Sequence, residues 1–126
     1  MKEVMAVIRM NMINKTKLAL IDAGIPSMTA MDALGRGKGL VDMALLKGAE
    51  QGYEEAISQL GQAGRLIPKR AISLVVPDKL VSKTVETIIH ANQTGKSGDG
   101  VVWVMPILDA LSVRASESGD RVLDDL

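Results

Sequence analysis

Residues 81–105, VSKTVETIIHANQTGKSGDGVVWVM, predict a helix, a glycine-rich turn and a strand in succession. Apolar or small side chains recur at i, i+3, i+4, i+7 and i+8, the spacing of an amphipathic helix. They are Val81, Thr84, Val85, Ile88 and Ile89. The run VVWVM is rich in β-branched residues and ends at Pro106, as a strand would. This stretch therefore indicates a fold of mixed helices and strands.

The remaining segments complete a recognisable order of elements. Val- and Ile-rich runs predict strands at Lys2 to Arg9, Met28 to Leu34 and Arg70 to Val76, and helical spacing predicts a helix from Lys15 to Ala23 that ends at Gly24. We also expect Asp78 to cap the second helix and Ile107 to Leu111 to form one helical turn. The order is βαββαβ, so we predict an α+β, ferredoxin-like sandwich: a four-stranded antiparallel sheet with two helices on one face. The other face, poor in aromatic residues, is expected to pack in an oligomer.

Composition excludes several classes of function. The 126 residues suit one domain, and fifteen basic residues balance fifteen acidic ones, so no overall field attracts nucleic acid or a membrane surface. Aromatic residues make up 2%, which removes the stacking platforms of single-strand binders. There is no cysteine and no apolar run of membrane-spanning length. We expect a cytoplasmic protein without membrane insertion.

A long segment separates the second and third strands. Residues 35–67 hold seven of the twelve glycines, and loops of this length are usually functional or disordered. Tyr53, Ile57 and Leu60 have the spacing of one amphipathic turn that docks on a partner; a tolerated insertion is the alternative. The acidic tail, about 115–126, is expected to be mobile.

Two glycine-rich loops are candidate anion sites. Gly95-Lys96-Ser97 imitates a Walker A end, but His90 stands where its first glycine belongs and the loop follows a helix, which excludes a P-loop. An anion nest of Gly98, Asp99 and Gly100 or a plain turn remains. The second loop is GRGKG, 35–39, and both loops could clasp one polyphosphate, with Lys69 and Arg70 adding charge. Arg114 is either a surface arginine or a phosphate clamp.

No catalytic or metal-binding set is evident in the sequence. His90 is the only histidine, and no cluster of histidines and carboxylates has metal-ligand spacing. No nucleophile has a paired base, so a small phosphotransfer or phosphatase enzyme is disfavoured. We expect a regulatory ligand-binding protein rather than an enzyme.

The chain resembles the PII nitrogen-signalling proteins over nearly its full length. The resemblance lies in MKEVMAVIR, ALIDAGIPSMTAMDALGRGKG, KGAE at 47–50, IPKRAISLVVPD, VETII and TGKSGDG followed by VVWVMP. It implies a ferredoxin-like fold in residues 1–126, assembly as a trimer, and ATP or ADP in the clefts between subunits. It also implies that the loop of about 36–68 touches target proteins and reports bound nucleotide and 2-oxoglutarate.

The resemblance also implies roles for particular residues. Lys69 and Lys38 match positions that bind 2-oxoglutarate, with magnesium as a further possibility, and Lys47 belongs to the target-binding loop. The positions that match nucleotide-binding residues of the family are Val7, Thr29, Gly35, Gly37, Lys38, Val75, Gly98, Asp99, Gly100 and Arg114.

Three positions depart from the family pattern. The lysine expected after GDG is Val101, the first of two phosphate-contacting arginines is Ser112, and a glutamine near Lys38 is absent. Each lost charge-assisted hydrogen bond is worth about 1.5–3 kcal/mol. A subunit that has lost nucleotide binding therefore stays an alternative.

The variant GRGKG, the segment IPKR and the enlarged loop resemble the branch encoded within nitrogen-fixation clusters. In that branch two different PII-like chains act together and inhibit nitrogenase when ammonium is plentiful, and 2-oxoglutarate with ATP relieves the inhibition. The implied partners are dinitrogenase and a sister subunit, in a homo- or hetero-trimer or a larger assembly. The alternative is regulation of an ammonium transporter or of nitrogen-assimilation enzymes. Gln51 follows KGAE where relatives carry a modified tyrosine, so uridylylation is not expected.

Overall fold

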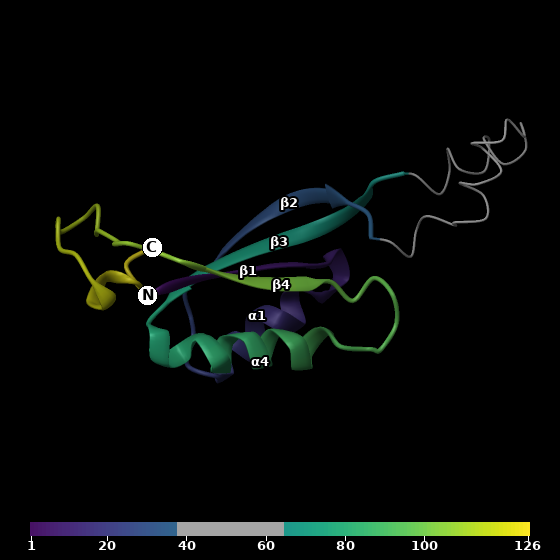
Figure 1. Cartoon of the computed structure of the whole chain (residues 1–126), viewed down its shortest axis with the longest axis horizontal. Helices are drawn as coiled ribbons and strands as arrows, with labels where there is room; N and C mark the ends of the chain where they lie inside the picture. Colours follow the sequence, from purple (N-terminus) through teal and green to yellow (C-terminus); the bar gives the residue numbers. More distant parts are fainter. Residues whose placement is uncertain (38–64) are drawn as a thin grey trace, which may run out of the picture.

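The computed structural model describes residues 1–37 and 65–126. In this part of the chain, four strands form one antiparallel sheet in the order β2-β3-β1-β4, and two α-helices cover one of its faces (Figure 1). The predicted ferredoxin-like α+β sandwich is confirmed. The elements are β1 Lys2–Arg9, α1 Ile13–Asp22, β2 Thr29–Gly35, β3 Ile67–Val76, α4 Val81–Asn92 and β4 Val101–Pro106.

The core lies between the helices and the sheet. Successive side chains of a strand point to opposite faces, and every second residue of β1 from Val4 to Ile8 is buried toward the helices. Ile72, Leu74 and Val76 do the same on β3, and Leu20 and Ile88 meet them from α1 and α4. This shared apolar layer fixes the strand register, because a slip by one residue would expose all of it.

The predicted strands and helices are present, with shifted boundaries. β3 begins at Ile67 rather than Arg70. Pro68 lies within this extension, beyond Lys69, which is the last β3 residue that pairs with β1. Among the described residues, no strand neighbours β3 on its β1 side at Pro68, so the missing N–H of Pro68 is tolerated. Gly24 ends α1 at φ +80°, the left-handed conformation that favours glycine after a helix.

The predicted cap of the second helix is wrong. Leu80 precedes α4 as its N-cap, and Asp78 opens a 3-10 turn, η3 Asp78–Leu80. The carboxylate of Asp78 instead accepts hydrogen bonds from Lys2 Nζ at 2.9 Å and lies 3.0 Å from the amino group of Met1. These cations hold the pKa of Asp78 below its usual value. The carboxylate of Asp78 thus pairs with two cations at the start of the chain and does not cap the helix.

The predicted helical turn at Ile107 to Leu111 is also wrong. The N–H of Ile107 donates to the carbonyl of Met1 at 3.3 Å, which keeps the chain beside β1 after Pro106 ends β4. Leu111 then forms an isolated antiparallel bridge with Ser118. The tail continues into a 3-10 turn, η4 Asp120–Val122, where Val122 is buried.

The second face of the sheet carries no helix in the described residues, and several large apolar side chains are exposed on it. They include Met31 at 46%, Trp103 at 38% and Met105 at 38% exposure. Trp103 pairs with Met5 across β4 and β1, and Met31 pairs with Ala71 across β2 and β3, which places all four on this open face. None of the described helices is long and apolar enough to cross a membrane.

Candidate functional site

Three strand ends bring the 93–100 loop and residues 35–37 together at one end of the sheet. Arg9, at the end of β1, pairs with Lys69, and Val101, at the start of β4, pairs with Val7. Gly35 ends β2 on the same side. A cleft of about 290 Å³ opens between these ends. Its walls are formed by Val7, Gly35, Arg36, Gly37, Lys69, Gly98, Gly100 and Val101.

A second hollow of about 540 Å³ adjoins this cleft and shares Gly37, Lys69 and Gly98 with it. Arg9 and Ser97 also line it, together with the apolar Ile67 and Pro68. Backbone groups of a glycine turn and the cations Arg9 and Lys69 thus meet in one concave region. Such a combination suits an anionic ligand with an apolar part.

Gly100 brings the 93–100 loop against β1. Its φ is +115°, and a Cβ built on it would lie 2.1 Å from the carbonyl oxygen of Val7. A side chain at this position would therefore overlap β1 and force a strained backbone. Glycine is required here for close packing, and this contact fixes where the loop enters β4.

The carboxylate of Asp99 is turned back into its own loop. It accepts hydrogen bonds from the backbone N–H groups of Thr94 at 2.7 Å and Gly95 at 2.9 Å, and from the Thr94 hydroxyl. Arg9 Nη1 donates to it at 2.7 Å. The pKa of Asp99 is held far below its usual range, mainly by the hydrogen bonds from Thr94 and also by those from Arg9 and Gly95. The charged carboxylate of Asp99 therefore stabilises the turn itself.

The 93–100 loop keeps a backbone donor for a ligand. Within the described residues, the N–H of Gly98 has no hydrogen-bond acceptor in the protein, whereas residues 97 and 98 form a hydrogen-bonded turn that closes at Asp99. Lys69 Nζ lies 3.5 Å from the Gly98 carbonyl and Arg9 Nη2 donates to the Ser97 carbonyl at 3.2 Å. Both cations therefore hold the loop and line the concavity beside it.

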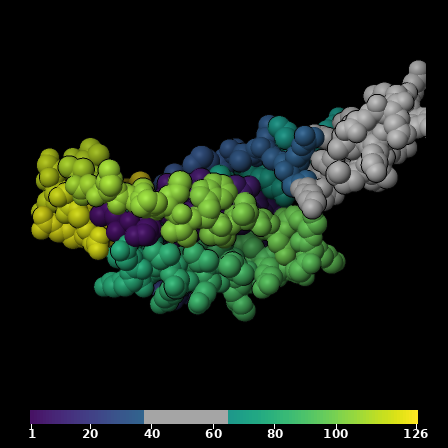
Figure 2. Space-filling model, in the orientation of Figure 1, coloured from purple at the N-terminus to yellow at the C-terminus, as the bar shows by residue number. Residues whose placement is uncertain are grey.

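The remaining predicted nucleotide-binding residues lie elsewhere. Val75 pairs with Glu3, four positions along β1 from Val7, which corresponds to about 13 Å. Thr29 is on the edge strand β2 opposite Ser73. Arg114 lies in the C-terminal segment, 107–126, which occupies the end of the molecule opposite the 93–100 loop (Figure 2). Within one chain, the predicted set is thus separated into two groups.

Several predicted residues lie outside the described residues. They are Lys38 of the predicted nucleotide and 2-oxoglutarate sites and the predicted target-binding residues Lys47, Tyr53, Ile57 and Leu60. In the described ranges, no three histidine, cysteine or acidic residues are grouped so that they could hold a metal ion.

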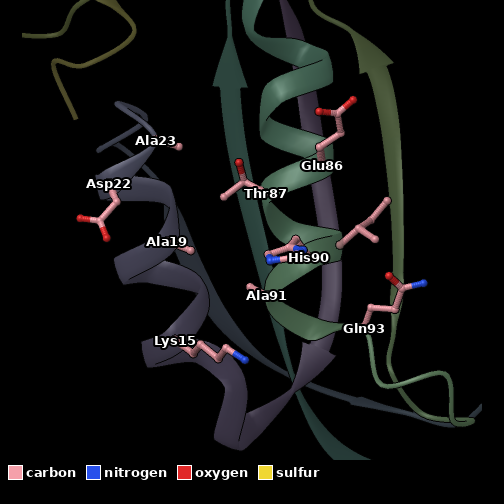
Figure 3. A pocket seen from close by; sticks show the side chains of 10 residues that line it. Lys15, Ala19, Asp22, Ala23, Glu86, Thr87, His90, Ala91 and Gln93 are labelled. Atoms are coloured by element: carbon pink, nitrogen blue, oxygen red, sulfur yellow. The ribbon is translucent and has the colours of Figure 1, made fainter.

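A larger groove, of about 760 Å³, lies between α1 and α4 (Figure 3). Lys15 extends from α1 toward α4, and His90 projects from α4 between the helices (Figure 3). Small residues such as Ala19, Ala23 and Ala91 form much of its floor. None of the residues predicted to bind nucleotide lines this groove, so its size does not make it the candidate site.

Sequence reasoning missed two residues of the loop architecture. The sequence pattern predicts Arg9 only as the end of a strand and Thr94 only as part of a turn. Alternation along β1 puts Arg9 on the same face as Val7, and a carboxylate five residues after a threonine can close a turn through side-chain hydrogen bonds. The first signal was readable from the sequence, but the contact between Arg9 and Asp99 joins positions 90 residues apart.

Comparison with known proteins agrees with this architecture. The family model of nitrogen regulatory protein P-II matches residues 1–117. The nitrogen fixation nifHD region GlnB-like protein 2 of Methanobacterium ivanovii is 45% identical over 123 residues, which cover 98% of this chain and 99% of that protein. Nitrogen regulatory protein P-II 1 of Escherichia coli K12 is 32% identical over 123 residues, covering 98% of this chain and all of that protein.

A solved structure shares the fold. The crystal structure of Arabidopsis thaliana PII bound to citrate superposes with a TM-score of 0.72 at 24% identity, covering 99% of this chain and 90% of that one. The match of the family model over most of the chain, and of relatives over almost all of it, confirms the resemblance read from the sequence. The chain belongs to the nitrogen regulatory P-II family.

Proposed function

We propose that this P-II protein binds adenine nucleotide and 2-oxoglutarate and restrains nitrogenase when ammonium is sufficient. Family members are regulatory signalling proteins rather than enzymes. The observation that carries the proposal is the cleft in which Val7, Gly98 and Lys69 meet at one end of the sheet. These residues come from three distant parts of the chain, and each matches a ligand-binding position of the family.

The phosphates are proposed to bind at the 93–100 loop. The N–H group of Gly98 is the proposed backbone donor, and Lys69 and Arg36 line the same cleft with positive charge. The volume of about 290 Å³ is at the lower limit for a small-molecule site. The cleft of one protomer is thus small for a nucleoside triphosphate, which favours completion by a neighbour.

A second protomer is proposed to complete the cleft. Thr29, Val75 and Arg114 lie too far from Gly98 to join the same cleft within one chain. The open face of the sheet, with Trp103 and Met31 exposed, provides an apolar surface for assembly. In a cyclic trimer each cleft would combine the 93–100 loop of one protomer with Arg114 of the next.

We propose that 2-oxoglutarate binds beside the nucleotide at Lys69, whose ammonium group would pair with a carboxylate. Lys38, at the root of the loop, is the second proposed contact. The described residues offer no carboxylate cluster for magnesium, so magnesium would be held mainly by the phosphates, as is usual for this ion. Ligand binding would then favour one arrangement of the target-binding loop over another.

The proposed target rests on the names of relatives. Proteins from nifHD regions of methanogens are 37–45% identical to this chain over nearly its whole length. A role beside nitrogenase, together with a sister P-II chain, follows from that similarity. Regulation of an ammonium transporter or of an assimilation enzyme is the competing proposal.

Calorimetric titration with ATP and magnesium tests ligand binding. We expect saturable binding of ATP, and binding of 2-oxoglutarate only when ATP and magnesium are present. The protein is titrated alone and after co-expression with its sister chain. No heat with ATP in either form would overturn the ligand proposal and leave an oligomer-forming subunit without nucleotide binding.

Affinity capture from nitrogen-replete cells tests the target. Recovery of a dinitrogenase component, released by 2-oxoglutarate with ATP, is the expected result. Recovery of an ammonium transporter instead would overturn the nitrogenase proposal while leaving the ligand proposal intact. Capture from nitrogen-starved cells, in which 2-oxoglutarate is expected to release the target, is the control.

A further inference from the structure

Arg9 reaches from the end of β1 to the 93–100 loop and contacts it at two points. Nη1 donates to the Asp99 carboxylate at 2.7 Å, and Nη2 donates to the Ser97 carbonyl at 3.2 Å. The side chains of Arg9 and Asp99 are 30% and 22% exposed, so the pair is largely shielded from water. The two contacts flank Gly98, and the guanidinium therefore spans the centre of the turn.

These contacts determine where the backbone donors point. A trans peptide unit is planar, with its C=O and N–H on opposite sides. The Ser97 carbonyl and the Gly98 N–H belong to one unit, so a hydrogen bond that holds the carbonyl also sets the direction of the N–H. Lys69, 3.5 Å from the Gly98 carbonyl, acts in the same way on the unit that carries the Asp99 N–H.

The turn accepts this arrangement because residue 98 is glycine. Its φ is +99°, which other residues rarely adopt. A Cβ at this position would also lie 3.2 Å from Arg9 Nη2. The absence of a side chain thus allows both the backbone conformation and the close approach of the guanidinium.

Arg9 also balances a charge beside the proposed phosphate site. The Asp99 carboxylate lies next to the backbone donors, where an unpaired negative charge would repel an anion. The guanidinium of Arg9 compensates that charge at hydrogen-bonding distance. Val101, which follows the loop directly, has no charge with which to do so.

We propose that Arg9 is a positioning residue of the nucleotide site. It holds residues 97–99 in the conformation that presents the Gly98 N–H group, and it compensates the charge of Asp99, without contacting the nucleotide itself. The proposal rests on the proposed binding of nucleotide to the 93–100 loop. Arg9 acts through Asp99 and the Ser97 carbonyl, and this indirect action distinguishes it from a phosphate ligand.

A double-mutant cycle on the full-length protein tests this role. ATP is titrated calorimetrically into the parent, Arg9→Gln, Asp99→Asn and the double variant. We expect Arg9→Gln to weaken ATP binding about tenfold in the parent but clearly less in the Asp99→Asn background, because one of its two partners is then changed. Arg9→Lys should recover part of the loss, since lysine keeps the charge but cannot bind both acceptors as the planar fork does.

The control is Arg121→Gln, which removes an exposed arginine that is 3.8 Å from Glu117 in the C-terminal segment. It should leave ATP affinity unchanged. An equal loss from Arg9→Gln in both backgrounds would mean direct contact with the nucleotide and would overturn the proposal. An unchanged affinity in Arg9→Gln would overturn it as well.

Amide NMR spectra of the ligand-free protein provide a readout that does not depend on nucleotide. In Arg9→Gln, the resonances of Gly98 and Asp99 should shift or broaden while those of the α1 amides stay in place; Arg121→Gln should leave the loop resonances unchanged. Unmoved Gly98 and Asp99 resonances would overturn the positioning role even if ATP binds. If the resonances move but the protein binds no ATP, the contact of Arg9 with the loop is supported and the proposed nucleotide binding is overturned.

Discussion

Two arginine–aspartate pairs lie at opposite ends of the molecule and differ in what surrounds them. Arg9 and Asp99 are 2.7 Å apart and largely shielded, and Asp99 also receives three hydrogen bonds from its own loop. Arg114 and Asp125 are 3.2 Å apart, and the side chain of Arg114 is 76% exposed. The first pair belongs to a network that shapes a turn, whereas the second joins an exposed arginine to a carboxylate that is 29% exposed. We therefore expect the 93–100 loop to tolerate substitution much less than the C-terminal segment.

The largest effect is expected from Gly100→Ala. The new Cβ would meet the Val7 carbonyl oxygen at 2.1 Å, and a φ of +115° is strained for alanine. We expect a loss of about 2–4 kcal/mol in the free energy of unfolding, measured by urea denaturation at fixed protein concentration. Gly37→Ala is the matched control, because its Cβ would meet nothing within 4 Å. Equal stability of the two variants would contradict the packing of Gly100 on β1.

Asp99→Asn should have the next largest effect, because asparagine cannot accept the same set of hydrogen bonds as a carboxylate. We expect ATP binding to weaken about tenfold in a titration at neutral pH. Asp124→Asn, an equal change of charge in the tail, should leave the affinity unchanged. An Asp99→Asn protein with parental affinity would show that the loop holds its shape without the carboxylate.

The same carboxylate predicts a pH dependence of stability. Because the folded-state pKa of Asp99 is depressed, its contribution is present above its unfolded value of about 4 and is lost as pH falls further toward the folded value. The difference in urea midpoint between the parent and Asp99→Asn should be constant from neutral pH to about pH 5 and should shrink below about pH 4. A difference that shrinks between about pH 6 and pH 8 would contradict this origin.

Arg114→Ala should weaken ATP binding by about tenfold, as expected for loss of one charge-assisted contact to phosphate. Its thermal midpoint without ligand should stay close to that of the parent, because surface ion pairs contribute little to stability. Arg121→Ala, another exposed arginine of the same segment, is the control for general loss of positive charge. Equal ATP affinities of the two variants would remove Arg114 from the proposed site.

Asp125→Asn is expected to have the smallest effect. The Ser112 hydroxyl, and then Arg114, hold the pKa of Asp125 below its usual value, yet the side chain of Arg114 is 76% exposed, so water screens the pair. Removing the charge should leave the thermal midpoint unchanged and strengthen ATP binding about two- to threefold at low salt, because a competing carboxylate beside Arg114 is then gone. Weaker ATP binding would instead indicate that Asp125 orients Arg114.

The fold was largely predictable because it depends on patterns that are local in the sequence. Alternation in β1 and helical spacing in α4 are readable from a few neighbouring residues. The errors at Asp78 and Ile107 have a different origin. Both residues contact the beginning of the chain, at Lys2 and Met1, and those contacts appear only when β1 is placed beside the later segments.

The candidate site was predictable only in part, for the same reason. Gly98 and Gly100 were identifiable from a glycine-rich turn, Lys69 and Arg114 were identifiable as basic candidates, and the family resemblance implied their ligands. The hold of Arg9 on Asp99 was not identifiable, because it depends on the register that brings the start of β4 beside the end of β1. The separation of the predicted nucleotide-binding residues between the two ends of the sheet also became visible only in three dimensions.

A mixed-assembly titration tests most directly whether nucleotide binding is shared between the two ends of neighbouring protomers. Asp99→Ala damages the loop end and Arg114→Ala damages the other end, so each variant alone should bind ATP weakly. When the two are co-expressed with different tags and the mixed oligomers are purified, some clefts combine an intact loop with an intact Arg114. We predict that these oligomers regain a class of sites with parental ATP affinity. If every site in the mixed oligomers stays as weak as in the single variants, the shared cleft is contradicted.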